Sequence, residues 1–439
     1  MARIDRKGSS GTTGNRASSP IEELLLAALE RGGDSLETGR YLVTFKEGAA
    51  EAGIQSLGGH GMRVADARDF ENQAMTLEDM GDADAVLFPE IGVALVGGDA
   101  AQARSLSVQS EIAADGPVES IDPEYFVFSD GSAVGSVSEY MRGFLRAAET
   151  IANDLRGAGQ SQSDLEEETL ALGATWGMTA CKVPPSLRSG LGIKVAVLDT
   201  GMDMGHPDFA GRLFASQTQS FVGEPVQDLH SHGTHCIGTS CGPKAPAGTT
   251  PRYGIGHRAS IFVGKVLTNS GSGSSGSVLN GMNWAIANRC QVISMSLGSQ
   301  SAVQPAYTAA GQAALNNGLL IIAAAGNSAS STGSPANSPT IMSVASLDMN
   351  LSPSSFSNFG KIEIAGPGRD IFSSVPRPTR YGIKSGTSMA TPHVAGCAAL
   401  WAESSASLRG INLWKRLQAT AKPLPFSATR VGAGLVQAP

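Results

Sequence analysis

The chain has 439 residues, enough for two or three domains, and its hydrophobic content of 41% is sufficient for packed cores. The formal net charge is -7 and no lysine or arginine cluster is present, which argues against a nucleic-acid partner. The five cysteines are an odd number, so at least one of them cannot pair within the chain.

The sequence also bears on location. Residues 1–20 are polar and rich in serine and glycine, without the apolar core of a signal peptide, and no stretch approaches the length of a membrane span. An unpaired cysteine favours a reducing compartment. We therefore expect a soluble cytoplasmic protein with no membrane partner, and export by a route that needs no signal peptide is the alternative.

The N-terminal third predicts a tail followed by a small domain. Residues 1–38 are predicted to form a disordered tail and a short amphipathic helix at 21–30. Between 39 and 130, strands are predicted at 41–45, 85–88, 92–96 and 118–128, with a helix at 100–114. This alternation predicts a small α+β domain of the ferredoxin-like type.

Residues 131–172 predict a helical, acidic connector. Apolar residues recur there at spacings of three and four, which indicates an amphipathic helix, and an acidic run follows at 164–168. The favoured interpretation is a solvated spacer. The alternative is a lid or tether that packs against the following domain.

Residues 173–439 predict an α/β domain with a doubly wound, mostly parallel sheet. Apolar runs and helices alternate, with strands expected at 195–199, 261–267, 292–297, 319–325 and 341–347, and helices at 278–288, 305–316 and 391–402. In such folds ligands bind beyond the carboxyl ends of the strands. Asp199 and Asn327 are both expected at such ends.

Three short segments of this domain carry side chains suited to catalysis. A buried strand ends in Asp199 and a glycine turn, His232 stands at the head of a helix of small residues, and Ser388 lies at the start of an apolar helix. Free backbone N–H groups and the helix dipole at such a start favour developing negative charge. Each residue alone also has a purely structural interpretation, as a turn aspartate, a helix-capping imidazole or an N-cap serine.

Together, in the order Asp, His, Ser, these segments resemble the signature segments of the subtilisin-like serine proteases. The matching segments are 197–201, 232–235 and 386–396. The resemblance implies a serine endopeptidase that hydrolyses peptide bonds through an acyl-enzyme. Ser388 would be the nucleophile, His232 the base and Asp199 the group that orients it, while His206, His235 and His393 would be structural.

The same resemblance implies groups that bind the substrate. Asn327 matches the asparagine that donates to the oxyanion, and Gly333 matches a small residue at the base of a neutral specificity pocket. Two segments match the edges that hold an extended polypeptide substrate, namely Gly271, Ser272, Gly273 and Ser296, Leu297, Gly298. For the Gly/Ser run 270–277, a plain flexible loop is the alternative.

The resemblance further implies a zymogen. The domain at 39–130 resembles the family's inhibitory propeptide, an intramolecular partner whose last strand lies in the substrate groove like a product. A separate small domain with its own role is the alternative. The connector departs from the family layout, in which the propeptide runs almost directly into the catalytic domain.

Two residues raise questions beyond the triad. Cys236 follows His232 by one helical turn, as in the thiol-containing, proteinase-K-like branch of the family. The alternative is that Cys236 is a buried thiol with no part in catalysis. Asp208 matches a carboxylate that binds structural calcium in many members, although residues 240–254 do not match the partner loop. We expect that the chemistry requires no cofactor.

Two rival functions stay open at this level. One is a catalytically silent scaffold in which the N-terminal domain stays clamped in the groove, and the joint presence of Asp199, His232, Asn327 and Ser388 weighs against it. The other is a peptide ligase or macrocyclase, which would resolve the acyl-enzyme with an amine. We expect a monomer.

Overall fold

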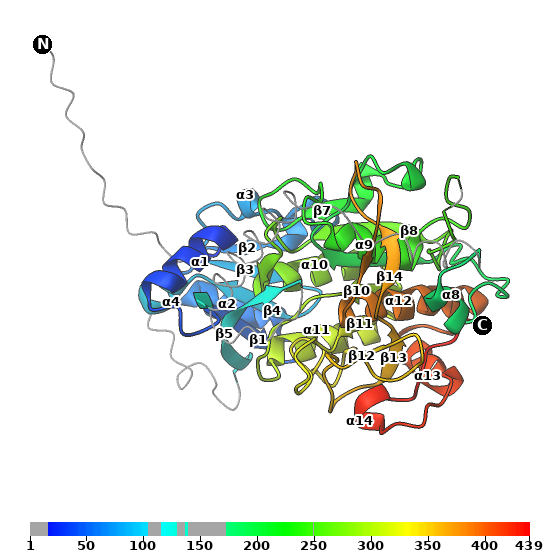
Figure 1. Cartoon of the computed structure of the whole chain (residues 1–439). Coiled ribbons are helices and arrows are strands. Elements are labelled where there is room, and N and C mark those ends of the chain that lie inside the picture. The colour runs from blue at the N-terminus through cyan, green and yellow to red at the C-terminus, as the bar shows by residue number, and fades with distance from the viewer. Residues whose placement is uncertain (1–15, 104–115, 130–136, 139–172, 249) are drawn as a thin grey trace, which may run out of the picture.

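The computed structural model describes residues 16–103, 116–129, 137–138, 173–248 and 250–439 (Figure 1). The helix predicted from residue 137 onward lies almost wholly outside the described residues, as do the acidic run and residues 104–114 of the helix expected at 100–114. The domain boundaries at 38, 130 and 172 therefore stay predictions.

A parallel sheet forms the centre of the larger domain. Among the described residues it has seven strands in the order β13-β12-β11-β10-β6-β8-β7. Their bounds are Lys194–Asp199 for β6, Thr218–Ser220 for β7, Ser260–Lys265 for β8, Val292–Met295 for β10, Leu320–Ala324 for β11, Met342–Leu347 for β12 and Ile364–Pro367 for β13. The pairs in this sheet are parallel. The chain thus has the predicted α/β fold with a doubly wound parallel sheet.

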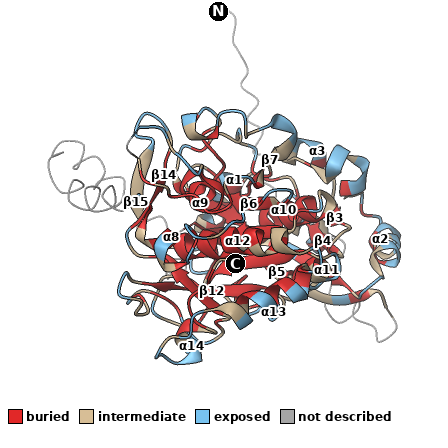
Figure 2. Cartoon of the chain, turned by 90° about the vertical axis from the view of Figure 1, so that its right-hand side faces the viewer, coloured by how far each residue is buried: buried red, intermediate tan, exposed pale blue. Residues whose placement is uncertain are grey.

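Helices cover both faces of this sheet. The hydrophobic cluster on one face includes residues of α9 (His232–Cys241) and α12 (Thr387–Ser404), and the cluster on the other includes residues of α10 (Ser275–Ala287) and α11 (Pro305–Asn316). In Figure 2, α9, α10 and α12 are almost entirely red, whereas α2 and α14 at the periphery are largely pale blue. Alanine, glycine, serine and threonine make up half of α9 and more than half of α12, which allows close helix packing.

Smaller elements complete this domain. A hairpin pairs β14 (Ile371–Ser374) with β15 (Tyr381–Lys384). The short helices are α8 (Trp176–Ala180), α13 (Gly410–Thr420) and α14 (Ala428–Val431). Sequence patterns predicted none of these smaller elements, and they also missed β7 and β13 of the parallel sheet. β13 has the sequence Ile-Ala-Gly-Pro, whose last two residues are typical of a turn.

The N-terminal region forms a second sheet with helices packed against it. The strands are β1 (Glu37–Phe45), β2 (Val64–Asp66), β3 (Ala85–Phe88), β4 (Val93–Val96) and β5 (Val118–Phe128), in the order β2-β3-β4-β1-β5. The helices are α2 (Ala50–Gly59), α3 (Leu77–Met80) and α4 (Gly98–Ala103). Apart from β2 and α3, the order β-α-β-β-α-β fits the expected ferredoxin-like arrangement. The sequence analysis did not predict α2, β2 or α3.

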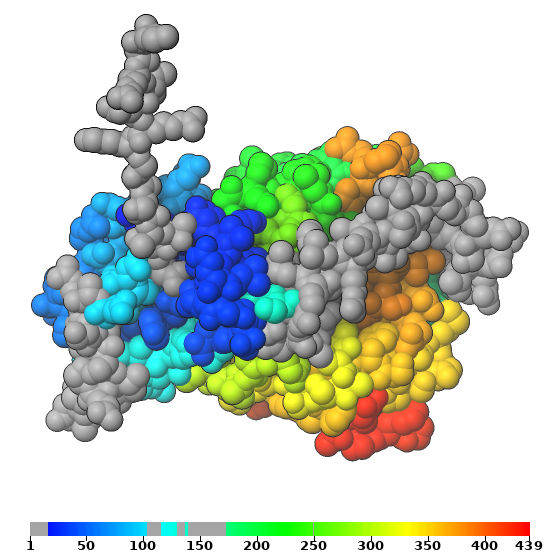
Figure 3. Space-filling model, turned by 60° about the vertical axis from the view of Figure 1, so that its left-hand side comes forward, coloured from blue at the N-terminus to red at the C-terminus, as the bar shows by residue number. Residues whose placement is uncertain are grey.

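The two sheets meet at one strand of the larger domain. β5 pairs with β9 (Ser272–Ser274), so the N-terminal sheet continues directly into the larger domain. Figure 1 shows β5 reaching from the blue N-terminal part toward the larger domain. The predicted helix at 21–30 is α1 (Ile21–Glu30), and it shares a hydrophobic cluster with Phe126 and Phe128 of β5 and with Val222. In Figure 3 the dark-blue segment that includes α1 lies between the N-terminal part and the green surface of the larger domain.

None of the described helices combines the length and apolar character needed to span a bilayer.

Candidate active site

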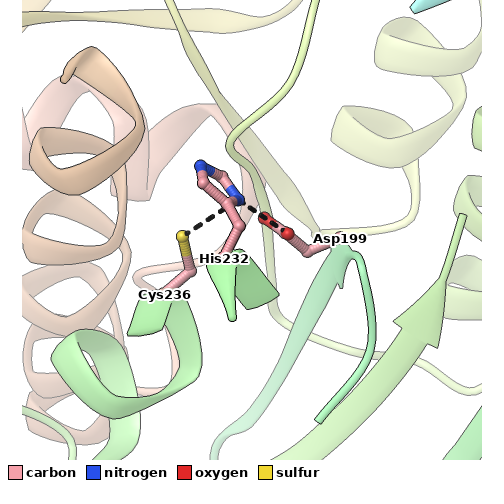
Figure 4. A group of neighbouring side chains, drawn as sticks. All are labelled: Asp199, His232 and Cys236. Atoms are coloured by element: carbon pink, nitrogen blue, oxygen red, sulfur yellow. Dashed lines mark hydrogen bonds and ion pairs between the residues drawn. The ribbon is translucent and has the colours of Figure 1, made fainter. Parts of the chain in front are cut away.

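Asp199 and His232 form a direct hydrogen bond in the centre of the larger domain. Asp199 is the last residue of β6, His232 is the first residue of α9, and His232 Nδ1 lies 2.8 Å from Asp199 Oδ1 (Figure 4). Asp199 is fully buried and His232 is 3% exposed. The structure therefore places both residues where the strand-end and helix-start patterns predicted them.

Two glycines make this approach possible. Gly201 has φ +101°, and a Cβ there would lie 2.1 Å from the carbonyl oxygen of Val226. In α9, a Cβ at Gly233 would lie 2.3 Å from the carbonyl oxygen of Gly201. The helix that carries His232 can therefore pack directly on the turn that follows Asp199.

Asp228, to which the sequence analysis assigned no role, holds the start of α9. Its Oδ1 accepts the backbone N–H groups of His230 and Ser231, both at 2.9 Å. Its Oδ2 accepts the N–H of Thr234 at 2.9 Å and the Thr234 hydroxyl at 2.7 Å. A buried carboxylate at a helix N-terminus satisfies the free N–H groups and favours the dipole. Asp228 is thus a positioning residue for His232.

Lys265, the last residue of β8, is a second residue that sequence reasoning missed. Its ammonium group is fully buried and donates to the carbonyl of Thr200 at 2.6 Å and to Asn269 Oδ1 at 2.9 Å. Glu224 lies 3.3 Å away as a counter-charge. Lys265 therefore ties the turn after Asp199 to the loop that precedes β9.

Ser388 is the second residue of α12, and the helix around it has an opening in its hydrogen-bond ladder. Pro392, four residues later, has no N–H to give to the Ser388 carbonyl. That carbonyl instead accepts the Ser296 hydroxyl at 2.8 Å and the Cys236 thiol at 3.5 Å. The proline thus links the start of α12 to the edge segment 296–298 and to α9.

Cys236 lies against His232, as the resemblance implied. Its Sγ is 3.9 Å from His232 Nδ1, and Figure 4 shows the thiol and the Asp199 carboxylate on two sides of the imidazole. Because the same sulfur contacts the Ser388 carbonyl, Cys236 joins the helix of His232 to the helix of Ser388.

The hydroxyl of Ser388 contacts the N-terminal region. Ser388 Oγ donates to the carbonyl of Ser129 at 3.1 Å, and the carbonyl of Ser296 lies 3.4 Å from the same Oγ. Within the described part of the chain, the buried Nε2 of His232 has no hydrogen-bond partner. The Ser388 hydroxyl is therefore hydrogen-bonded to the Ser129 carbonyl and not to His232 Nε2.

Asn327 is held beside Ser388. Its Oδ1 accepts the N–H and the hydroxyl of Thr387, at 2.8 and 2.9 Å. These two bonds fix the plane of the side-chain amide next to the start of α12. The structure thus brings Asn327 and Ser388 together, as expected from the resemblance.

The two edge segments predicted to bind substrate hold a strand between them. Phe126, Val127 and Phe128 of β5 pair antiparallel with Ser274, Gly273 and Ser272. On this same edge, the N–H of Ser129 donates to the carbonyl of Gly271 at 2.9 Å. On the opposite edge, Phe128 and Gly298 exchange two backbone hydrogen bonds of 3.0 Å each. The run 270–277 is thus a paired strand and a helix start. Ser274 and Ser277 form a capping box that starts α10.

Gly333 lies in the wall of a small cavity next to Ser388. The cavity has a volume of about 10 Å³, and Leu297, Gly298, Gly326 and Ser388 also line it. A Cβ on Gly333 would lie 2.7 Å from the carbonyl oxygen of Ser299. No charged side chain is among the residues described around this cavity.

The electrostatics favour a charged imidazole at His232. Burial on its own lowers the pKa of His232, but the Asp199 carboxylate outweighs it and holds the pKa well above the ordinary value of 6.5. By contrast, burial raises the pKa of the Cys236 thiol, so this group stays protonated at neutral pH.

The other histidines assigned structural roles contact backbone carbonyls. His206 Nε2 lies 2.9 Å from the Arg380 carbonyl, His235 Nε2 lies 2.8 Å from that of Ile371, and His393 Nδ1 lies 2.9 Å from that of Met389. Each of these rings is thus bound to the backbone of the same domain, which is compatible with the structural role expected for them.

Asp208, the candidate calcium ligand, faces two phenols. Its Oδ2 accepts the hydroxyl of Tyr253 at 2.6 Å and that of Tyr381 at 3.0 Å. A calcium ion needs several converging oxygens with free lone pairs, and these donors point protons at the position that a cation would take. Within the described residues, the only cluster of three acidic, histidine or cysteine side chains is Asp199, His232 and Cys236. The residues around Asp208 do not fit a calcium site.

Comparison with known proteins agrees with this geometry. The family model described as Subtilase family matches residues 190–434. The chain belongs to the subtilase family. An alkaline protease of Alkalihalobacillus alcalophilus is 40% identical over 286 residues, covering 63% of this chain and 72% of that protein. Subtilisin Savinase of Lederbergia lenta is 40% identical over 272 residues, covering 60% of this chain and 96% of that protein.

A solved structure supports the same assignment. The crystal structure of a cold adapted subtilisin-like serine proteinase matches this subtilase with a TM-score of 0.52 and 33% identity, covering 60% of this chain and 97% of that one. The protein is therefore a subtilisin-like serine peptidase, as the three segments predicted.

The expectation of a cytoplasmic location is wrong. The relatives are secreted extracellular subtilisins, which conflicts with it. The cysteine argument failed for a physical reason, because Cys181, Cys236, Cys241, Cys290 and Cys397 are all buried. A buried thiol is shielded from oxidants, so its unpaired state says little about the redox environment.

Proposed function

We propose that this subtilase is an endopeptidase made as a self-inhibited zymogen, with Asp199, His232 and Ser388 as its catalytic triad and residues 39–130 as its inhibitor. One observation carries the proposal. The last strand of the N-terminal domain lies between the two substrate edges, and its Ser129 carbonyl sits 3.1 Å from Ser388 Oγ. A polypeptide bound in this way has the position of a substrate or a product.

The proposed chemistry assigns one role to each of the three groups. His232 Nε2 removes the proton of Ser388 Oγ as this oxygen attacks the carbonyl carbon of the substrate. The Asp199 carboxylate accepts the Nδ1 proton, which fixes the tautomer and stabilises the imidazolium. His232 then returns its proton to the leaving amine, and water resolves the acyl-enzyme by the same route in reverse.

The developing oxyanion needs fixed donors. We assign this role to the Nδ2 group of Asn327 and the backbone N–H of Ser388 near the start of α12. The hydrogen bonds from Thr387 to Asn327 Oδ1 orient the amide before substrate arrives. A preoriented donor needs no rearrangement during the reaction, which is the basis of this kind of stabilisation.

The N-terminal domain binds through buried polar contacts as well as strand pairing. Glu124 of β5 is fully buried and accepts the N–H of Gly276, at the start of α10, at 2.8 Å. The same carboxylate pairs with Arg40 Nε at 2.6 Å, and Arg40 also donates to Ser274 Oγ at 3.0 Å. On the outer face of α10, Asn280 donates to the Met75 carbonyl at 3.0 Å.

These contacts explain how the helix α10 can be buried on all sides. They also favour inhibition over an unrelated role for the domain, because they bury a charge pair at the interface and place β5 in the groove.

The calcium prediction gains no support from the contacts of Asp208, and no cofactor enters the mechanism that we propose.

The test compares the full-length chain with its Ser388→Ala variant by intact mass over time. We expect the first to be cut near the end of the bound strand, with a new N-terminus at residue 130 or 131, and the second to stay whole. A fluorophosphonate should label Ser388 only in the unmodified protein. Fragments from both proteins, or a first cut beyond residue 135, would contradict the proposal.

The same experiment separates the two rivals. A silent scaffold would show neither labelling nor fragments. A ligase would give a joined or cyclic product that is one water lighter than the hydrolysed product. Circular dichroism of the Ser388→Ala variant provides the control for folding.

A further inference from the structure

A second cavity lies beside the catalytic pair. Its volume is about 360 Å³, and it is bounded on one side by the loop Leu229, His230 and Ser231 and on the other by the hairpin β14–β15, including Tyr381 and Lys384. His230 is two residues before His232, and Lys384 is four residues before Ser388. Both walls of the cavity are therefore continuous with the segments that carry the triad.

Lys384 gives the lining of this cavity a positive charge, and none of the lining residues that the structure describes is a carboxylate. His230 also belongs to the lining, and an imidazole carries at least one N–H donor. The Tyr381 hydroxyl is already donated to Asp208 at 3.0 Å. Asp370, which precedes the strand partner of Lys384, accepts the hydroxyl of Ser385 at 3.2 Å and does not line the cavity. A bound group would therefore meet a cationic wall.

The field of Lys384 reaches toward the catalytic centre. Burial lowers the pKa of His235, on the helix of His232, and the charge of Lys384 lowers it further. The ring centroid of His230 lies 6.2 Å from that of His232. Lys384 and His230 therefore lie near the reacting groups.

The cavity adjoins the end of the bound strand near Ser388. The bound strand runs along β9 and ends with the Ser129 carbonyl at Ser388. His230 stands at that end, because a Cβ added to Gly271 would meet both His230 Nε2, at 2.7 Å, and Ser129 Oγ, at 2.8 Å. No described residue of β5 lines the cavity. A polypeptide that continues beyond Ser129 therefore has this cavity next to it.

We propose that this cavity binds the residues that follow the cleaved bond and selects acidic side chains there, with Lys384 as the main specificity determinant and His230 as a second donor. The inference rests on the proposed function, since it requires cleavage at Ser388. In the chain itself, the residue that follows Ser129 is acidic, namely Asp130. A partly exposed charge pair of this kind changes kcat/KM by about 1.5-fold to fivefold.

The experiment uses the full-length chain after self-processing, with active sites counted by a fluorophosphonate. The probes are three quenched peptides that differ only in having Glu, Gln or Lys in the first position after the cleaved bond. We expect the Glu peptide to have the highest kcat/KM and the Lys peptide the lowest. High salt should narrow the differences, because the cavity is open to solvent.

The matched variants are Lys384→Gln and Lys415→Gln, which remove the same charge. Lys415 lies exposed on α13 and is not part of the cavity. The Lys384→Gln variant should bring the Glu to Gln ratio close to one while it still cleaves the Gln peptide, and Lys415→Gln should keep the original ratio. The additional change His230→Asn should remove what remains of the preference.

The outcomes separate this inference from the proposed function. Normal cleavage of the Gln peptide with no preference for Glu, or a preference that survives Lys384→Gln, overturns the inference and leaves the endopeptidase proposal standing. If no peptide is cleaved and Ser388 is not labelled, the proposed function is wrong and the inference is wrong with it.

Discussion

Pro392 and Ser388 are four residues apart on α12, and because proline has no N–H, the Ser388 carbonyl is bound by Ser296 and Cys236 instead of by its own helix. One missing backbone donor thus connects the helix of the nucleophile to a substrate edge and to the helix of the base. The relation shows that the site is positioned by contacts between segments that are distant in sequence.

The contact between Asp199 and His232 should control the rate of the chemical step. In Asp199→Asn, an amide replaces the acceptor of the Nδ1 proton, which favours the wrong imidazole tautomer. We expect kcat to fall by about 10⁴-fold, as for such a change in other triads, with little change in fold. Steady-state kinetics with a peptide substrate and circular dichroism measure this. A loss below about tenfold would count against the role of Asp199.

The raised pKa of His232 predicts an alkaline pH profile. Burial lowers this pKa, but Asp199 outweighs it, so the imidazole needs a pH well above 6.5 to become the neutral base. The acid limb of kcat/KM should therefore have its midpoint above 6.5. Since the pKa is raised in the folded state, the stability that it adds is present below the unfolded value and is lost as pH rises through the folded value. An acid limb below the ordinary pKa would contradict this assignment.

Cys236 should make the enzyme sensitive to mercurials. Its sulfur lies between the imidazole and the Ser388 carbonyl, so a bulky mercury adduct would displace both groups. We expect the loss of activity to be proportional to the labelling of one thiol. The Cys236→Ala variant should keep its own activity when it is treated with the mercurial. The four other cysteines provide the control, because they remain in that variant. Full activity after stoichiometric labelling of Cys236 would refute the prediction.

Removal of the Asn327 amide should damage turnover more than binding. The variant Asn327→Ala loses a donor that acts on the oxyanion, and such losses typically reduce kcat by about 10²- to 10³-fold. KM should change little, because the ground-state carbonyl depends less on this donor. Near-normal kcat in a folded variant would show that Asn327 is not the oxyanion donor.

The buried pair of Arg40 and Glu124 should control release of the N-terminal domain. Burial alone would raise the pKa of Glu124, but Arg40 outweighs it, and the pKa is lowered. The stabilisation of docking by this carboxylate is therefore present above the ordinary pKa and is lost as pH falls through the lowered value. We expect Glu124→Gln to shorten the lag between self-cleavage and full activity, because breaking a buried pair costs about 3–5 kcal/mol.

Glu119→Gln is the matched control for that experiment. Glu119 is on the same strand, β5, but is exposed, so its loss should leave the lag unchanged. If the Glu124→Gln lag is as long as that of the unmodified chain, the charge pair does not hold the domain in place.

The sequence determined much of the fold and the identity of the site. Asp199 ends an apolar run and Ser388 begins an apolar helix, so local periodicity alone placed them at a strand end and a helix start. The order of the three segments then indicated the family. Local pattern failed where the elements were short or atypical, as in β13 with its Gly-Pro end, and where cysteine number was taken to report on location.

Only the tertiary structure decided which distant groups meet. Ser129 and Ser388 are 259 residues apart, Arg40 and Glu124 are 84 apart, and Cys236 and Ser388 are 152 apart. The burial of Lys265 under the turn after Asp199, and the phenols at Asp208, likewise depend on how the segments pack. The physical reason is that hydrophobic periodicity is a property of neighbouring residues, whereas a contact between distant residues exists only after the whole chain has packed.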